Sequence, residues 1–263
     1  MSELYGIPLA TGARKALHVI YEKSAPIQYR EVERSHLASA DYHRLNPAGL
    51  VPVLVLSDAR TLVESSIIMR YVDDVYPGPR LQPNDPYTRA RMNLWMKWVD
   101  ERYFAASSAL SIATYIRSLL GSPLDENRLQ IMLRSLTEPA HRALWEEAIR
   151  QGLESEAVKA SLVTLAEMLQ RIEEVLKSGA WLAGSEFSLA ESAVFPIMLR
   201  LQELGLEESW DTRLPRVTDW WKRMGFRSST QRVLELVSDE TRADLRASAD
   251  VMRAEILSAL IQG

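Results

Sequence analysis

Two short stretches of the sequence combine residue types that could bind a small charged ligand. In the first, Glu64 and Ser65 lie where a predicted strand ends and a predicted helix begins. A serine at this point is a candidate N-cap, and the N-terminus of a helix favours an anion. The neighbouring carboxylate suits an ammonium group. The pair therefore predicts a site for a zwitterion, with helix capping alone as the alternative.

The second stretch is Val51-Pro52, directly before another predicted strand. The bond between these residues is a candidate cis peptide, because the cis form of an X-Pro bond costs only about 0.5–1 kcal/mol. That geometry would expose the N–H and C=O of Val51. An exposed backbone pair can bind a peptide-like ligand as an added strand. A turn proline without a binding role is the alternative.

Several common catalytic centres are absent from the sequence. It has no cysteine, which excludes disulfides, thiolate–metal sites and a cysteine nucleophile, so any reactive thiol must come from a ligand. The four histidines are His18, His36, His43 and His141. They show no metal-ligand spacing on a plausible helix, and we expect no metal. A glycine-rich phosphate loop and a Gly-x-Ser-x-Gly elbow are also missing.

Charge and hydropathy exclude two further classes of partner. The net charge of −4 argues against binding to nucleic acid, which needs clustered Lys and Arg. No apolar run approaches the roughly 18 residues of a membrane span, and residues 1–5 lack a basic-then-apolar leader. We therefore expect no membrane partner and a cytoplasmic protein.

The first 80 residues alternate between strand and helix patterns. Apolar spacing predicts helices over 14–23 and 66–76. The side chains of the second helix that we expect to face inward are Ile67, Ile68, Tyr71, Val72 and Val75. The predicted strands are 4–5, 27–32, 53–56 and 61–63. This order predicts a small sheet flanked by helices.

A proline-rich linker follows, with four prolines between Pro77 and Pro86. Beyond it, only helical spacing recurs, including a capping box over 188–191. We therefore predict a thioredoxin-sized domain over 1–78 and a linker over 79–89. An all-helical domain is expected over 90–263, with an insert near 118–155 and a C-terminal helical extension.

The residues from Asn46 to Leu54 read Asn-Pro-Ala-Gly-Leu-Val-Pro-Val-Leu and are followed by Glu64-Ser65. This combination resembles the glutathione site of the glutathione transferase superfamily. The start at Leu4-Tyr5, the pair Arg14-Lys15, the linker and the capping box agree with it in order. The resemblance implies an α/β thioredoxin-like N-terminal domain followed by an all-α helical C-terminal domain, which is the glutathione transferase fold. It also implies glutathione as co-substrate.

The same resemblance implies which residues hold glutathione. Val51 and Pro52 would take the cysteinyl part through the backbone, and Glu64 and Ser65 would take the γ-glutamyl end. The glycine carboxylate needs a cation, and family members often carry Lys or Gln just before the Val-Pro pair. This chain has Leu50 there, which is a departure from the pattern.

Three other cations could replace the missing one. His43 and Arg44 are nearby in the sequence, and Arg14 is a more remote candidate. All three are equally plausible as surface charges.

The residue that activates the glutathione thiol is expected near the start of the first helix. The tyrosine position of the family maps approximately to Gly6. Tyr5 is adjacent, but neighbouring strand residues face opposite sides, so we predict Tyr5 in the core. The serine and cysteine positions fall across 10–13, where Thr11 is the only hydroxyl. Thr11 and backbone amides such as that of Gly12 would stabilise a thiolate; a simple N-cap role for Thr11 is the alternative.

In this superfamily the helical domain supplies the pocket for the electrophile. The candidates here are Tyr103, Phe104, Ser107 and Tyr115, which could line a pocket for an aromatic group. Aromatic residues at helical spacing are also typical of a core, and this is the alternative.

Residues 95–104 look like the fourth helix of the bacterial β-aryl-etherase branch, which cleaves lignin-derived ethers with glutathione. That branch usually has Asn or Ser in the activating loop, where this chain has Gly12 and Ala13. The resemblance thus implies a glutathione-dependent transferase acting on an apolar, aromatic electrophile, with β-aryl ether cleavage as one form. A glutathione-binding interaction or regulatory protein with little turnover is the alternative. Members of this family usually form homodimers, so the resemblance also implies a homodimer.

Overall fold

The structure, a computed structural model, describes all residues except 135, 137 and 263. The chain packs into two compact units. The first comprises Met1–Val99, Ser178–Pro196 and Asp219–Ser238. The second comprises Asp100–Lys177, Ile197–Thr218 and Asp239–Gly263. The domain limits expected at residues 78 and 89 stay a prediction.

The first unit contains a four-stranded sheet in the order β2-β1-β3-β4. Its strands are β1 (Ser2–Gly6), β2 (Ile27–Glu31), β3 (Val53–Val55) and β4 (Thr61–Leu62). Strand β1 is parallel to β2 and antiparallel to β3, and β3 is antiparallel to β4. The four strands agree with the sequence-based expectation within one or two residues at each end, and the sequence made no prediction of their order in the sheet.

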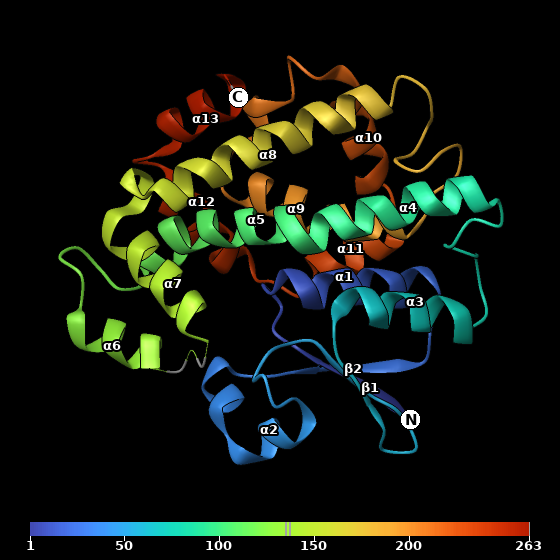
Figure 1. The fold of residues 1–263 in the computed structure, drawn as a ribbon, viewed down its shortest axis with the longest axis horizontal. Coiled ribbons are helices and arrows are strands. Elements are labelled where there is room, and N and C mark those ends of the chain that lie inside the picture. The colour runs from blue at the N-terminus through green and yellow to red at the C-terminus, as the bar shows by residue number, and fades with distance from the viewer. Residues whose placement is uncertain (135, 137, 263) are drawn as a thin grey trace. The chain divides into compact units, whose positions relative to one another are not determined.

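Helices α1 (Thr11–Glu22) and α3 (Ser65–Val75) pack side by side on one face of this sheet (Figure 1). Short, mostly apolar residues let α1 lie close to the strands, and Ala13, Ala16 and Leu17 are almost fully buried. A cluster of Val32, Tyr42 and Val53 joins the other face to η1 (Arg34–Ala38) and α2 (Ala40–Leu45).

Two of the α3 side chains that were predicted to face inward are exposed. Ile67 and Val75 are each 52% exposed, whereas Ile68, Met69 and Val72 are fully buried. Ile68, Met69 and Val72 share one face of α3, and at about 100° per residue Ile67 points to the opposite side, whereas Val75 is the exposed last residue of the helix. The expected inward positions of Ile67 and Val75 are therefore wrong, and Met69 takes the place in the core.

All described residues after β4 are helical or in loops. The α-helices are α4 (Pro86–Trp98), α5 (Phe104–Ser111), α6 (Glu126–Arg134), α7 (Pro139–Gln151), α8 (Glu156–Val175), α9 (Leu189–Glu203), α10 (Pro215–Gly225), α11 (Ser228–Leu234), α12 (Asp239–Ala249) and α13 (Arg253–Gln262). Two π-helical segments, η2 (Val99–Tyr103) and η3 (Ile112–Ile116), flank α5. In the second unit α5 packs against α8. The predicted change from a mixed sheet to helices is confirmed. In the described part of the chain, no helix has the length and apolar character needed to cross a membrane.

Candidate functional site

The first turn of α1 presents backbone amides without a side-chain cap. Ala10 is the N-cap residue and Thr11 is the first helical residue, so the alternative role of Thr11, as a simple N-cap, is wrong. The first amides of a helix have no partner within it. The N–H groups of Thr11, Gly12 and Ala13 therefore form a site that favours an anion, with the partly exposed Thr11 beside it.

Gly12 is the point at which three distant segments meet. A Cβ atom on Gly12 would lie 3.0 Å from Cδ of Pro52, 3.4 Å from the carbonyl oxygen of Val51 and 3.7 Å from Cβ of Ser65. The start of α1, the Val51-Pro52 loop and the start of α3 thus pack together around a residue without a side chain. Four of the predicted site residues are brought together here.

The loop before β3 is held by Tyr42, which the sequence did not single out, and by Asn46, the first residue of the Asn46–Leu54 stretch. The carbonyl oxygen of Leu50 accepts hydrogen bonds from the Tyr42 hydroxyl at 2.9 Å and from Nδ2 of Asn46 at 2.8 Å. The Val51-Pro52 bond is cis, as predicted. Strand β3 pairs with β1 only from Val53 onward, so the N–H and C=O of Val51 lie outside the ladder.

The start of α3 also departs from the expected cap. Glu64, not Ser65, is the N-cap residue, and its side chain makes no cap hydrogen bond. Its φ of 65° places it in the left-handed region, which is uncommon for a residue with a side chain. Such strain is frequent at ligand sites. Glu64 is exposed and Ser65 is buried at the first helical position.

A buried lysine connects the two helices beside this site. Lys15 is fully buried, and its Nζ donates to Oγ of Ser66 at 2.8 Å. This bond ties α1 to α3 next to Ser65. Lys15 was not among the predicted site residues, and the signal that could have found it is a lysine between apolar neighbours on a helix expected to be buried.

The cations considered for a carboxylate differ in their surroundings. His43, on α2, is partly exposed, and its Nε2 lies 3.1 Å from the position of a Cβ on Gly49. Arg44 is exposed and pairs with Asp41 at 2.5 Å. Arg14 is buried, and its Nε donates to the carbonyl oxygen of Pro8 at 2.7 Å. Leu50 is 51% exposed and supplies only its backbone to the loop.

Tyr5, which was predicted in the core, is only partly buried and packs against the cluster that contains Tyr42 and Val53. Its hydroxyl donates to Oε2 of Glu3 at 2.9 Å. The four residues expected to line an electrophile pocket lie in the second unit.

These four residues differ in exposure. Tyr103 and Ser107, one helical turn apart, are buried, and burial raises the pKa of the Tyr103 hydroxyl. Phe104 is 37% exposed and Tyr115 is partly exposed. Their role in a pocket stays a prediction.

Two family models match this chain. The model described as "Glutathione S-transferase, N-terminal domain" matches residues 12–75, and the one described as "Glutathione S-transferase, C-terminal domain" matches residues 125–227. The first covers Gly12, Val51, Pro52, Glu64 and Ser65 of the site described above and begins one residue after Thr11.

Curated proteins of this kind align with nearly the whole chain. Protein LigF of Sphingobium sp. strain SYK-6 is 28% identical over 240 residues, which cover 89% of this chain and 93% of LigF. Glutathione S-transferase GstB of Escherichia coli K12 is 24% identical over 239 residues, covering 89% of this chain and 98% of GstB.

Solved structures agree with this likeness. The crystal structure of the β-etherase LigF from Sphingobium sp. strain SYK-6 has a TM-score of 0.77 and 27% identity, covering 90% of this chain and 99% of LigF. A glutathione transferase homologue from Sulfitobacter, solved with bound glutathione, has a TM-score of 0.65 at 23% identity. It covers 89% of this chain and 97% of its own, and it supports the fold alone.

Proposed function

This chain belongs to the glutathione S-transferase family, and we propose that it binds glutathione and uses the bound thiolate to attack an apolar, aromatic electrophile. One observation carries the proposal: the first turn of α1, the Val51-Pro52 loop and the start of α3 converge on Gly12. These segments offer a backbone edge outside the sheet ladder, an anion site and a carboxylate within one small region. A γ-glutamyl tripeptide with a thiol needs all three.

The backbone of Val51 binds the cysteinyl part of glutathione as an added strand, because its N–H and C=O lie outside the sheet ladder. The exposed carboxylate of Glu64 pairs with the γ-glutamyl ammonium group. Ser65 and the first amides of α3 bind the γ-glutamyl carboxylate at the positive end of the helix.

We propose that the side chain of His43 binds the glycine carboxylate of glutathione. Arg44 already pairs with Asp41, and Arg14 is buried with its Nε bonded to the carbonyl oxygen of Pro8. His43 is partly exposed and contacts the 46–50 loop at Gly49. Its imidazole can donate a hydrogen bond to the carboxylate.

The thiol is activated at the first turn of α1. The hydroxyl of Thr11 and the amides of Gly12 and Ala13 stabilise a thiolate, and a helix N-terminus can lower a thiol pKa by about a unit or more. The thiolate sulfur then forms a bond to carbon and the leaving group departs with the electron pair. With an aryl ether substrate, a C–S bond replaces a C–O bond and the released phenoxide takes a proton from water.

The likeness to the β-etherase LigF supports an aryl ether as the first substrate class to test. Tyr103, Phe104, Ser107 and Tyr115 are the candidates for holding its aromatic part. A second copy of the chain would bury exposed apolar side chains of the first unit, and Ile67 on α3 and Leu94 on α4 are 52% and 43% exposed. This supports a homodimer, which light scattering would test.

The test of the function is glutathione binding followed by turnover. The protein should be retained on immobilised glutathione, and the double variant Glu64→Ala/Ser65→Ala should not be. Retention of the double variant would contradict the site assignment. Turnover is then measured across aryl ethers, haloarenes, epoxides and peroxides. Thiolate absorbance in the ultraviolet reports the pKa of the bound thiol. A normal thiol pKa without turnover would favour the glutathione-binding interaction protein.

A further inference from the structure

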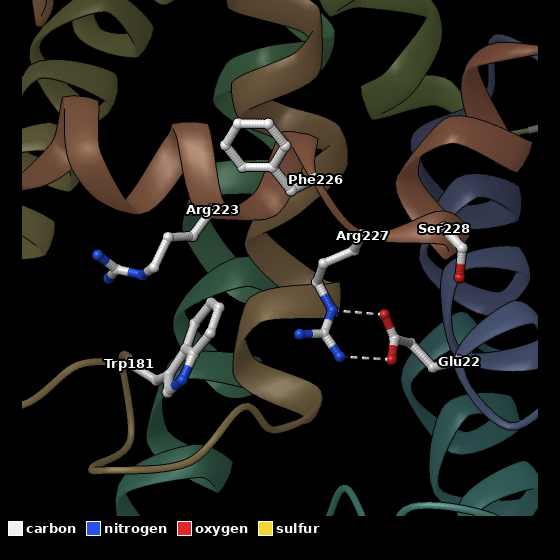
Figure 2. A pocket seen from close by; sticks show the side chains of 6 residues that line it. All are labelled: Glu22, Trp181, Arg223, Phe226, Arg227 and Ser228. Atoms are coloured by element: carbon white, nitrogen blue, oxygen red, sulfur yellow. Dashed lines mark hydrogen bonds and ion pairs between the residues drawn. The ribbon is translucent and has the colours of Figure 1, made fainter.

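Charged side chains tie both ends of α1 to the elements that pack on it. At the C-terminal end, Glu22 accepts hydrogen bonds from Nε and Nη2 of Arg227 at 2.6 and 2.7 Å (Figure 2). The next residue, Lys23, is buried, and its Nζ donates to Asp73 of α3 at 3.0 Å. At the N-terminal end, Lys15 is also buried and also bonded to α3, and it lies beside the proposed glutathione site.

The position of Lys15 on α1 directs its side chain to this site. Lys15 comes four residues after Thr11 and three after Gly12, so the three residues share one face of the helix. Side chains on a helix also lean toward its N-terminus, so the Lys15 side chain runs back along the first turn of α1. Its Nζ ends 2.8 Å from Oγ of Ser66, the residue after Ser65. An ammonium group thus lies beside the start of α3.

Two of the first amides of α3 are already used. The N–H groups of Ile67 and Ile68 both donate to the carbonyl oxygen of Glu64, at 3.0 and 2.9 Å. An anion at this helix start is therefore bound by the two residues before them, Ser65 and Ser66. Both serines are buried. In a buried site the attraction between opposite charges is strong, because little water screens it.

The burial of Lys15 is costly. Taking an ammonium group out of water is unfavourable, and an apolar side chain of similar length could fill the same space without that loss. Packing alone therefore does not account for a lysine at this position. A charge held in a buried place beside a ligand site is typical of a group that acts on the ligand.

We propose that Lys15 is a positioning residue for glutathione. Its ammonium group holds the Ser66 hydroxyl in place and supplies the positive charge for the γ-glutamyl carboxylate at the start of α3. This inference rests on the proposed function and assigns one more residue to the same site. Glu64 binds the γ-glutamyl ammonium group, so two side chains of opposite charge recognise the two charges of this end of glutathione.

The test compares three thiol peptides by isothermal titration of the full chain. They are glutathione, glutaryl-Cys-Gly, which lacks the γ-glutamyl ammonium group, and γ-aminobutyryl-Cys-Gly, which lacks the γ-glutamyl carboxylate. Lys15→Met should weaken the binding of glutathione and of glutaryl-Cys-Gly by the same factor, about 10-fold or more, because it removes the charge that attracts the carboxylate. It should leave the affinity for γ-aminobutyryl-Cys-Gly unchanged, because this peptide has no carboxylate at that end.

Two further variants make the pattern specific. Glu64→Gln should show the reverse pattern, with weaker binding of glutathione and γ-aminobutyryl-Cys-Gly and unchanged binding of glutaryl-Cys-Gly. Ser66→Ala keeps the charge of Lys15 and removes the hydrogen bond that aims it. It should weaken the same two peptides as Lys15→Met, by a smaller factor of about 3-fold. This variant tests the inference even if Lys15→Met does not fold.

Lys23→Met is the matched control, because Lys23 is also a buried lysine that joins α1 to α3. Its loss takes one partner from Asp73, so the free energy of unfolding should fall while the relative affinities for the three peptides stay as they are. Equal weakening of all three peptides by Lys15→Met, or the Lys15→Met pattern in Lys23→Met, would overturn the inference. Absence of glutathione binding by the unchanged protein would instead contradict the proposed function.

Discussion

Cδ of Pro52 lies 3.0 Å from the position that a Cβ of Gly12 would occupy. The pyrrolidine ring therefore packs directly on the first turn of α1, and the carbonyl of Val51 follows at 3.4 Å. This contact places the free backbone edge of Val51 beside the amides of α1. This close contact explains why position 12 is a glycine, although its backbone is not in the left-handed region.

Gly12→Ala should weaken glutathione binding about 10-fold or more. The added methyl group must push the Val51-Pro52 loop away, and such crowding costs about 1–3 kcal/mol. Alanine also stabilises the helix by up to about 1 kcal/mol relative to glycine, which offsets part of this cost. The free energy of unfolding should therefore change less than the free energy of glutathione binding. Urea unfolding and titration with glutathione measure the two effects.

Gly225→Ala is the control for this substitution. A Cβ at Gly225, the last residue of α10, meets no atom within 4 Å. It should leave glutathione affinity unchanged. Equal glutathione affinity in Gly12→Ala and the unchanged protein would remove Gly12 from the site.

Glu64→Gly should move stability and binding in opposite directions. Glu64 has a φ of 65°, which is unfavourable for a side chain by about 1 kcal/mol or more and free of strain for glycine. We therefore expect a higher free energy of unfolding together with the loss of the ammonium partner and weaker glutathione binding.

Ala59→Gly separates these two effects. Ala59 has a φ of 68° in the turn between β3 and β4. It should gain similar stability with no change in glutathione affinity. If Glu64→Gly binds glutathione as tightly as the unchanged protein, the carboxylate has no role in recognition.

Thr11→Val tests the hydroxyl at nearly constant shape. If the hydroxyl donates to the thiolate, its loss removes a hydrogen bond to a charged group, which contributes about 1.5–3 kcal/mol. We expect the pKa of the bound thiol to rise and turnover to fall about 10-fold or more. Thr11→Ser should retain both properties. Unchanged turnover in Thr11→Val would leave activation to the amides of α1 alone.

His18 should make the fold less stable as the pH falls from about 6.5 to about 4. Burial lowers the pKa of His18 to about 4, from 6.5 in an exposed histidine. Over this window the unfolded chain binds a proton at His18 that the folded chain excludes. Acid therefore favours unfolding, by about 3 kcal/mol in total. Above pH 6.5 the full contribution is present. Urea unfolding at a series of pH values measures it.

Burial also raises the pKa of Glu191 to about 7, which acts in the opposite direction over part of this window. The comparison must therefore be between proteins that share Glu191. His18→Gln should lose the His18 part of the pH dependence, whereas His36→Gln, at an exposed position, should retain it. A parallel pH dependence in His18→Gln and the unchanged protein would contradict the assignment to His18.

Local patterns predicted much of the fold. Alternation and helical spacing placed four strands and the helices around them, because burial of one face imposes a period on the sequence. The wrong predictions concern the N-cap residues of α1 and α3 and the buried face of α3, where two local sequence rules favoured different residues. Ser65 and Thr11 are good capping residues, yet both lie at the first helical position, and Glu64 and Ala10 precede them. Likewise Ile67 and Ile68 are both apolar, and only packing against α1 selected Ile68.

The sequence by itself determined the family and the candidate residues of the glutathione motif, because these depend on order and spacing along one stretch of chain. Only the tertiary structure decided that Gly12 receives Pro52, and that Glu22 faces Arg227 across 205 positions. Such contacts arise when separate helices and loops pack into one unit, and local spacing carries no information about them.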